Sequence, residues 1–560
     1  MRKLNKKIKI TLYTLFGIPF VFCLITFLIG LYLYYTADFL QPNVNVNLAK
    51  YNLSINSDSL RVCDNSFMRL NEHGVWETFI SGEPIDRGAR YGLISKDLLE
   101  YQEDVFVNQI HEIIPSEWWV NFLHKLTAIF NRNLAKHVPN EYREEIYAMS
   151  LSCSNKYNSY GTPYERQLNY HAAHDIGHAM QQYMLVGCSS FACWGNDSKT
   201  GGLIIGRNFD FYVGDDFAKN KVVLFVEPNQ GYRFASISWP GMMGVLSGMN
   251  EKGLTVTINA SKGAIPLSSA MPISLLARHI LQYAANIDEA YKIAQQSTTF
   301  VSESILIGSA QDGYAAIIEK TPEKCTIYKS QSSRLICTNH YQSEIFKNDE
   351  HNKENIATSD SPYRFNRINE LLNETTPLDP VGAVDILRNR YGLNNSDIGI
   401  GNEKAINQFI AHHAIVFEPK ELRFWVSTPP WQLGEFVCYD LDDVFKNPSY
   451  ERLSLAQTDL NISADSVALD NEYKRICLFR NQYKQIIKTI EEEGRISHRL
   501  KNDFIANNPN YFQVYNVLGD YELSIGNETD ALKYWRKALS LEIPRLSDKE
   551  EIISKINEYD

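Results

Sequence analysis

The chain has 560 residues, 44% hydrophobic and 22% charged, values that are ordinary for a folded protein and exclude a disordered or fibrous chain. This length exceeds that of a usual single core, so we expect two or three domains. The net charge of -11 argues against a nucleic-acid partner. The nine cysteines are an odd number, so at least one thiol is free or bonded outside the chain.

The N-terminal segment predicts a membrane anchor. Residues 1–9 form a basic flank, and residues 10–35 carry no charged side chain. A bilayer span needs about 20 apolar residues, whereas the apolar core of a cleaved signal peptide, which is the alternative, has only about 7–15. The basic flank predicts one membrane-crossing helix with a cytoplasmic N-terminus and the rest of the chain outside the cytoplasm, in the periplasm if the source is bacterial.

After the predicted anchor, the pattern of apolar and polar residues differs from one segment to the next. Residues 36–60 are rich in Asn and Ser and predict a tether, and residues 61–187 predict a mostly helical region. Short apolar runs divided by turn signals follow over residues 188–435 and predict strands, with helices among them. Strands grouped with helices in this way predict an α+β layered domain. We expect residues 436–465 to be a linker.

The last segment, residues 466–560, is polar and predicted to be helical. One window matches the tetratricopeptide pattern through Tyr515, Leu518, Gly519, Gly526, Ala531, Trp535, Ala538 and Pro544. One repeat is fewer than the roughly three that a solenoid needs, so neighbouring helices must complete the stack. Two roles stay open for this TPR-like segment: a helical cap on the central domain, or a surface that binds a protein partner.

Five short motifs carry the candidate chemistry. In chain order they are Gly187-Cys188-Ser189-Ser190, Gly206-Arg207-Asn208-Phe209-Asp210, Asn250-Glu251-Lys252-Gly253 with Asn259 beyond it, Thr338-Asn339-His340, and Tyr363-Arg364-Phe365. This order resembles the N-terminal-nucleophile (Ntn) hydrolases of the choloylglycine hydrolase and isopenicillin N acyltransferase type, above all the acyl-coenzyme A:6-aminopenicillanic-acid acyltransferase branch. The resemblance covers roughly residues 80–430, including the segment from Gly82 to Gly92. It implies a four-layer αββα sandwich.

The resemblance also implies that a precursor cuts itself between Gly187 and Cys188, so that residues 61–187 are a pro-region and Cys188 becomes the first residue of the mature chain. A glycine carbonyl is unhindered, and a thiol can hold an acyl group until water removes it. The new α-amine would have a pKa of about 7.7–8, near the balance wanted in a general base. The products would be fragments of 187 and 560 minus 187, or 373, residues.

Further site residues carry over from the family one position at a time. Asp210 matches the aspartate that binds the amine of the nucleophile, and Arg207 would lie close by in a less defined role. Asn259 and Asn339 match asparagines that stabilise the oxyanion of the reaction, and losing one such donor typically costs about 10²–10³ in rate.

Arg364 matches the arginine that lies near the thiol and lowers its pKa. Arg367 is close enough in sequence to compete for this role. Each candidate also has a structural alternative: a lone cysteine in a strand is commonly a small buried side chain, as we expect of Cys193, and Asn250 belongs to a hairpin turn.

A histidine cluster offers a different chemistry. One predicted helical face carries His171, His174 and His178, with Asp175 beside them. Histidine and aspartate are residue types that bind zinc. One straight helix presents ligands from one side only, and a tetrahedral shell needs a contribution from elsewhere. We therefore expect a packed helix face, with neither a metal nor a cofactor.

Together these patterns predict a self-processing cysteine enzyme that acts on a small acyl-amide or acyl-thioester substrate. The acyl group would pass from Cys188 to water or to an amine, and sequence does not separate hydrolase from acyltransferase because pocket shape and water exclusion choose the acceptor. The alternatives are an inactive Ntn-fold scaffold that binds a partner through its helical tail, and a zinc-dependent enzyme that uses the histidine face.

Overall fold

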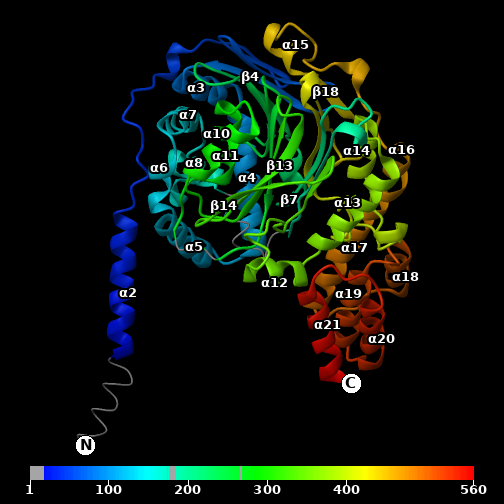
Figure 1. The fold of residues 1–560 in the computed structure, drawn as a ribbon. Coiled ribbons are helices and arrows are strands. Elements are labelled where there is room, and N and C mark those ends of the chain that lie inside the picture. The colour runs from blue at the N-terminus through cyan, green and yellow to red at the C-terminus, as the bar shows by residue number, and fades with distance from the viewer. Residues whose placement is uncertain (1–17, 173–174, 176–184, 265, 267) are drawn as a thin grey trace, which may run out of the picture.

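Two stacked β-sheets form the centre of the computed structural model, and helices cover their outer faces (Figure 1). The structure describes residues 18–172, 175, 185–264, 266 and 268–560.

The larger sheet has 11 strands in the order β1-β2-β3-β4-β8-β9-β10-β11-β12-β13-β14. All neighbours are antiparallel except β4 and β8, which are parallel. The strands are β1 (Leu53–Asn56), β2 (Leu60–Cys63), β3 (Ser66–Leu70), β4 (Trp76–Gly82), β8 (Val222–Pro228), β9 (Phe234–Ser238), β10 (Ser247–Asn250), β11 (Leu254–Ala260), β12 (Glu303–Ser309), β13 (Tyr314–Lys320) and β14 (Cys325–Lys329).

The smaller sheet has seven strands, in the order β15-β6-β7-β16-β17-β18, with β5 also paired to β7. Its strands are β5 (Leu185–Val186), β6 (Ser189–Cys193), β7 (Ile204–Tyr212), β15 (Arg334–Cys337), β16 (Ala411–Glu418), β17 (Arg423–Ser427) and β18 (Phe436–Asp440). Apolar side chains from both sheets fill the space between them, among them Ile205, Phe225, Leu306, Ile415 and Phe424. Burial of this shared face holds the two sheets together.

Two helical layers complete the sandwich. The larger sheet packs against α3 (Pro84–Ile94), α4 (Lys96–Ile113), α6 (Leu134–His137), α7 (Asn140–Ser150), α8 (Pro163–His171), α10 (Ile273–Tyr283) and α11 (Ile287–Gln296), with α5 (Glu117–Phe130) beside them. The smaller sheet packs against α13 (Ser361–Thr375) and α14 (Pro380–Leu387), and α12 (Glu350–Thr358) precedes them. The expected α+β class and its four αββα layers are therefore present.

The C-terminal segment is helical, as predicted. After α15 (Leu441–Lys446) and α16 (Ser466–Ala468) come α17 (Lys474–Glu491), α18 (His498–Asn507), α19 (Phe512–Ser524), α20 (Glu528–Leu539) and α21 (Leu546–Tyr559). A Cβ on Gly519 would lie 2.4 Å from the ring of Trp535, so α19 and α20 approach closely because a glycine stands there. The tetratricopeptide character of these helices stays a prediction.

Two segments differ from the sequence expectation. Strands β1 to β4 lie within residues 53–82, where we expected a tether and a mostly helical region, and β18 lies in the expected linker. These strands are only 4 to 7 residues long. Strands β1 to β4 pair one after another along the chain, and β4 joins the rest of the sheet by parallel pairing with β8, which a local pattern does not reveal.

The membrane anchor expected over residues 10–35 is not supported. In the described part of the chain, no helix combines the length and the apolar character that a membrane span requires. Residues 18–35 form α2 (Ile18–Tyr35). Residues 10–17 lie outside the described residues.

A buried carboxylate ties three helices of the larger layer together. Glu145 of α7 forms ion pairs with Arg87 of α3 at 3.0 Å and with Arg278 of α10 at 2.6 Å. Burial raises the pKa of Glu145, but the charges of Arg278 and Arg87 outweigh it and hold the pKa below its ordinary value. A Cβ on Gly88 would lie 2.0 Å from the Glu145 carbonyl oxygen, so only glycine permits this approach of α3 to α7.

Replacing Glu145 should therefore weaken the whole layer. We expect Glu145→Ala to lower the free energy of unfolding by about 3–5 kcal/mol, because it leaves two buried arginines without their partner. Equilibrium urea denaturation measures the loss. The neighbouring Glu144→Ala is the matched control and should change stability by less than about 0.5 kcal/mol; equal losses in both variants would contradict this role of the ion pairs.

Candidate active site

Strand β7 pairs with the chain segments that precede and follow the predicted cleavage bond. Strand β5 ends at Val186 and β6 begins at Ser189, and both pair antiparallel with β7. Between them, the Gly187 N–H donates to the carbonyl oxygen of Asp210 at 3.1 Å. The bond from Gly187 to Cys188 therefore lies in an almost continuous ladder, and its position is fixed by backbone hydrogen bonds rather than by a loop.

The Cys188 thiol is fully buried. Burial raises its pKa to about 11, while the charge of Arg207 lowers it, those of Asp210 and Glu303 raise it, and that of Arg364 lowers it. Arg207 is the nearest cation, with its Nη2 donating toward Cys188 Sγ at 3.7 Å. In the uncut chain the thiol is therefore protonated at neutral pH, and Arg207 is placed to stabilise the thiolate when it forms.

Arg364 of α13 connects the nucleophile to the second asparagine. Its Nη1 donates to the Cys188 carbonyl oxygen at 2.7 Å and to Ser189 Oγ at 2.9 Å. Its Nη2 donates to Asn339 Oδ1 at 2.7 Å, and its Nε donates to Asp360 Oδ2 at 2.9 Å. All five donors of a guanidinium lie in one plane, so this set of partners holds Arg364 in a single orientation.

The competing arginine has other partners. Arg367 donates to Asn389 at 3.3 Å, to Glu370 at 3.0 Å and, by a short contact, to Asn395. The structure thus brings Arg364, and not Arg367, to the candidate nucleophile.

The Asp210 side chain is buried and has no hydrogen-bond partner among the described residues. This holds for both of its carboxylate oxygens. Burial raises its pKa to about 8, although the charges of Arg364 and Arg207 lower it. A buried carboxylate without a partner is unfavourable, so this side chain is suited to receive a cation.

The two candidate oxyanion asparagines are engaged with the backbone. Asn259 donates through Nδ2 to carbonyl oxygens that include that of Cys337, at 2.9 Å, and accepts from Ser190 Oγ at 3.0 Å. Asn339 donates through Nδ2 to the Ala260 carbonyl oxygen at 2.8 Å, which leaves one of its two amide N–H groups. Within the described chain, neither amide is hydrogen-bonded to the Cys188 side chain.

Arg207 is held by residues that the sequence did not indicate. Its Nη2 donates to the Ile258 carbonyl oxygen at 2.6 Å, and its Nη1 lies 3.3 Å from His413 Nε2 and makes a short contact with Ser247 Oγ. Because a guanidinium only donates, His413 Nε2 acts as an acceptor here. Burial, reinforced by the charge of Arg207, lowers the pKa of His413 well below its ordinary value, in keeping with a neutral ring.

These partners were missed because they lie far along the chain. His413 reaches the site because β16 pairs with β7, opposite Phe209, and Ser247 reaches it from the other sheet. The sequence marks His413 as a strand residue, and only the order of the strands places it beside Arg207. Glu303, whose charge acts on Cys188, is also missed for this reason.

The histidine face does not form a described metal site. In His171, Nδ1 lies 2.7 Å from the Gln167 carbonyl oxygen, and Nε2 accepts from the Met243 N–H at 2.9 Å. Both ring nitrogens are therefore used by the backbone. The other two histidines, at 174 and 178, lie outside the described residues, and the residues that the structure does describe contain no group of three or more metal-ligating side chains.

His171 should make stability depend on pH. Burial lowers its pKa to about 4 from an ordinary value of 6.5, so the unfolded chain binds the proton first, and stability falls as the pH drops below about 6.5. We expect the wild type to lose about 3 kcal/mol more than His171→Asn between pH 7.5 and pH 4, at about 1.4 kcal/mol per pKa unit. Denaturation series at several pH values measure this difference. His498→Asn, which removes an exposed histidine, should show the same dependence of stability on pH as the wild type. If the stability of His171→Asn also falls with pH in parallel with the wild type, the role assigned to His171 is contradicted.

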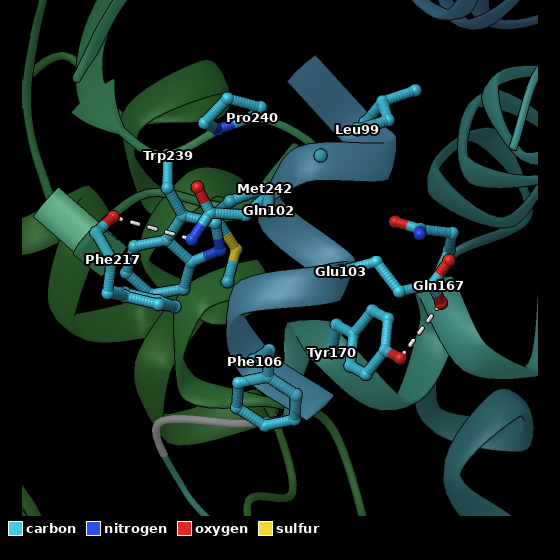
Figure 2. Close-up of a pocket in the computed structure, with 11 residues that line it drawn as sticks. Leu99, Gln102, Glu103, Phe106, Gln167, Tyr170, Phe217, Trp239, Pro240 and Met242 are labelled. Carbon is cyan, nitrogen blue, oxygen red and sulfur yellow. Dashed lines mark hydrogen bonds between the residues drawn. The ribbon is translucent and has the colours of Figure 1, made fainter. Parts of the chain in front are cut away.

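An aromatic pocket of about 30 Å³ lies between α4 and the chain after β9 (Figure 2). Its aromatic walls are Phe106, Tyr170, Phe217 and Trp239. The volume suits about one water molecule, and the candidate nucleophile is not among the residues that line it. Trp239 stacks on Phe211 of β7 with ring centroids 5.8 Å apart, which connects the pocket wall to the strand that carries the site.

Comparison with known proteins gives a family match over the centre of the chain. Residues 195–429 match the family model of the acyl-coenzyme A:6-aminopenicillanic acid acyl-transferases. The matched range contains five of the candidate residues, namely Arg207, Asp210, Asn259, Asn339 and Arg364, and it begins after Cys188.

Curated relatives are distant. An uncharacterized protein of Archaeoglobus fulgidus is 20% identical over 522 residues, which are 83% of this chain and 82% of that protein. Protein dcd1B of Dictyostelium discoideum is 22% identical over 270 residues, which are 45% of this chain and 51% of that protein. The match to dcd1B thus spans about half the length of that relative.

Solved structures overlap with part of the chain. An N-acylethanolamine-hydrolyzing acid amidase ortholog of Caenorhabditis elegans is 16% identical, with a TM-score of 0.31, and the match covers 42% of this chain and 93% of that chain. A mutant conjugated bile acid hydrolase of Clostridium perfringens is 13% identical, with a TM-score of 0.31, and covers 46% and 92%. Over residues 195–429, the chain is similar to the acyl-coenzyme A:6-aminopenicillanic acid acyl-transferase family.

Proposed function

We propose that this chain is a self-processing cysteine enzyme of the Ntn type, which takes an acyl group from a linear amide or thioester onto Cys188 and passes it to water or to an amine. The observation that carries the proposal is the buried, unpartnered carboxylate of Asp210 beside the bond from Gly187 to Cys188. Breaking that bond would produce an α-ammonium group next to this carboxylate.

Self-cleavage needs no other reactant than water. The Cys188 sulfur attacks the Gly187 carbonyl carbon, the carbon–nitrogen bond breaks, and the thiol proton passes to the departing nitrogen. The result is a thioester on Cys188 with a free α-amine. Water then hydrolyses the thioester, which releases a carboxylate at Gly187 and restores the thiol.

Turnover would use the groups that cleavage creates. The α-amine of Cys188 takes the thiol proton as general base, since its pKa of about 7.7–8 suits that exchange at neutral pH. Asp210 holds the amine in place, and Arg207 stabilises the thiolate from 3.7 Å. The asparagines at 259 and 339 would supply oxyanion donors, which for Asn259 requires a shift of its amide away from the backbone carbonyl that it now contacts.

Cleavage and its nucleophile are tested together. We expect purified wild-type protein to give fragments of 187 and 560 minus 187, or 373, residues, with Cys188 at the start of the larger one. Cys188→Ala should stay intact and should show no turnover on N-acyl amino acids, bile-salt-like amides, β-lactams or acyl thioesters. Intact-mass analysis and N-terminal sequencing give the readout.

Cys193→Ala is the matched control, because this neighbouring thiol is packed in the apolar core beneath α13 and α14. It should be cut and should turn over as the wild type does. Fragments from Cys188→Ala would refute self-cleavage by this thiol, and turnover by Cys188→Ala would refute its catalytic role. An intact wild-type chain without turnover would favour the scaffold alternative.

The role of Asp210 predicts a shift in the pH profile of the cut enzyme. A carboxylate beside the α-amine stabilises the ammonium form and raises the amine pKa, so Asp210→Asn should move the ascending limb of kcat/KM to lower pH. We also expect kcat/KM to fall by about 100-fold or more, because the base loses its orientation. Asp216→Asn, at an exposed position, should match the wild type. A rate loss without any shift of that limb would contradict contact between Asp210 and the amine.

A further inference from the structure

We propose that Gln408 is a catalytic residue of the self-cleavage step, in which its side-chain amide donates to the oxyanion that forms on the Gly187 carbonyl. This inference rests on the proposed function and assigns a role to a residue outside the five motifs.

Gln408 lies against the predicted cleavage site. Gln408 is only 3% exposed. A Cβ on Gly187 would lie 3.0 Å from Gln408 Nε2, 3.4 Å from its Oε1, and 3.6 Å from Arg364 Nη2. The Gln408 amide therefore faces the residue whose carbonyl is attacked, and the glycine leaves room for that approach.

Among the described residues, the amide nitrogen of Gln408 has no hydrogen-bond acceptor. This nitrogen, Nε2, is also buried. A buried donor without a partner is unfavourable. When the Gly187 carbonyl becomes tetrahedral, its oxygen takes negative charge, and a nearby N–H group then gains a strong acceptor. An interaction that is made only in the transition state lowers the barrier rather than strengthening the ground state.

Most of the other N–H groups near this carbonyl already have an acceptor, although Nη2 of Arg364, which carries two N–H groups, has only one acceptor among the described residues. Arg364 donates through Nη1 to the Cys188 carbonyl oxygen and to Ser189 Oγ, and through Nη2 to Asn339 Oδ1. The Asn259 amide donates to the backbone at Cys337. Gln408 is thus placed to act on the Gly187 carbonyl without first breaking a hydrogen bond of its amide nitrogen.

The loop that carries Gln408 is held in place by the C-terminal helices. The next residue, Phe409, has a φ of +57°, a strained backbone for a bulky side chain. Its N–H donates to Asn407 Oδ1 at 3.0 Å, and its carbonyl oxygen accepts from Arg480 Nη2 of α17 at 2.7 Å. These two contacts stabilise the conformation that directs Gln408 to the site.

A second contact fixes the start of the same loop. Asn508, between α18 and α19, accepts from the Ile400 N–H at 2.9 Å and donates to the Ile400 carbonyl oxygen at 2.8 Å. Figure 1 shows α18 and α19 at the lower right, gathered with α20 and α21 below α13 and α14.

The test is the rate of self-cleavage in full-length chains made by cell-free synthesis, followed as conversion of the 560-residue chain to the 373-residue fragment, where 373 is 560 minus 187. Gln408→Leu removes the donor at similar volume, and Gln408→Glu replaces the amide nitrogen with a carboxylate oxygen that repels the oxyanion. We expect cleavage to slow by about 10²–10³ in Gln408→Leu and by at least as much in Gln408→Glu.

Gln432→Leu is the matched control, because Gln432 is also fully buried in the same domain and its amide makes one long contact to the described residues, at 3.5 Å to the Leu387 carbonyl oxygen. It should cut within about threefold of the wild type. Circular dichroism of each chain checks folding, and the polar Gln408→Glu remains the test if Gln408→Leu does not fold. Cleavage of Gln408→Glu or a folded Gln408→Leu at the wild-type rate overturns the role of Gln408 and leaves self-cleavage standing. A wild-type chain that stays intact overturns both.

Discussion

The pairing of β5 and β6 with a single strand, β7, is the constraint on which the site depends. It fixes the bond from Gly187 to Cys188 in a ladder, opposite the backbone of Asp210. Successive side chains of a strand point to opposite faces. Arg207 of β7 accordingly reaches Ile258 in the other sheet, whereas Asn208 reaches the carbonyl of Leu387 in the helical layer. The charged groups that contact Cys188 are Arg207, which extends from β7 toward the other sheet, and Arg364 of α13 in the helical layer, so a strand and a helix place them.

Burial determines how these charges behave before and after cleavage. In the uncut chain, burial raises the pKa of Cys188 to about 11 and that of Asp210 to about 8, so both groups are held mainly in their neutral forms at neutral pH. An α-ammonium group beside Asp210 would reverse the balance for the carboxyl, because an opposite charge at short range favours the ionised form. The proposed cleavage would thus complete an ion pair of which the uncut chain contains only the acidic half.

The sequence predicted local patterns well and long-range contacts poorly. The strand-rich region over residues 188–435 and the helical segment over residues 466–560 were evident, because the apolar spacing and turn residues that indicate such elements lie within short windows of sequence. Strands β1 to β4 were missed although they pair one after another, because they are only 4 to 7 residues long and β4 joins the sheet through a parallel partner distant in sequence. For the same reason the motif residues around Cys188 were recognised, whereas His413 and Gln408 were not, since only the order of strands and a loop conformation bring them there.

The C-terminal helices share a hydrophobic core with the central domain. Ile400, Phe409 and Leu433 of the central domain are buried in one cluster with residues of α17, α19 and α20, among them Phe479 and Trp535. Separating the helices from the domain would expose these side chains, at roughly 1.5–3 kcal/mol for each large apolar group. The loop between α14 and β16 that carries Gln408 is therefore only as rigid as this shared core, although the C-terminal helices lie outside residues 195–429, which match the family model.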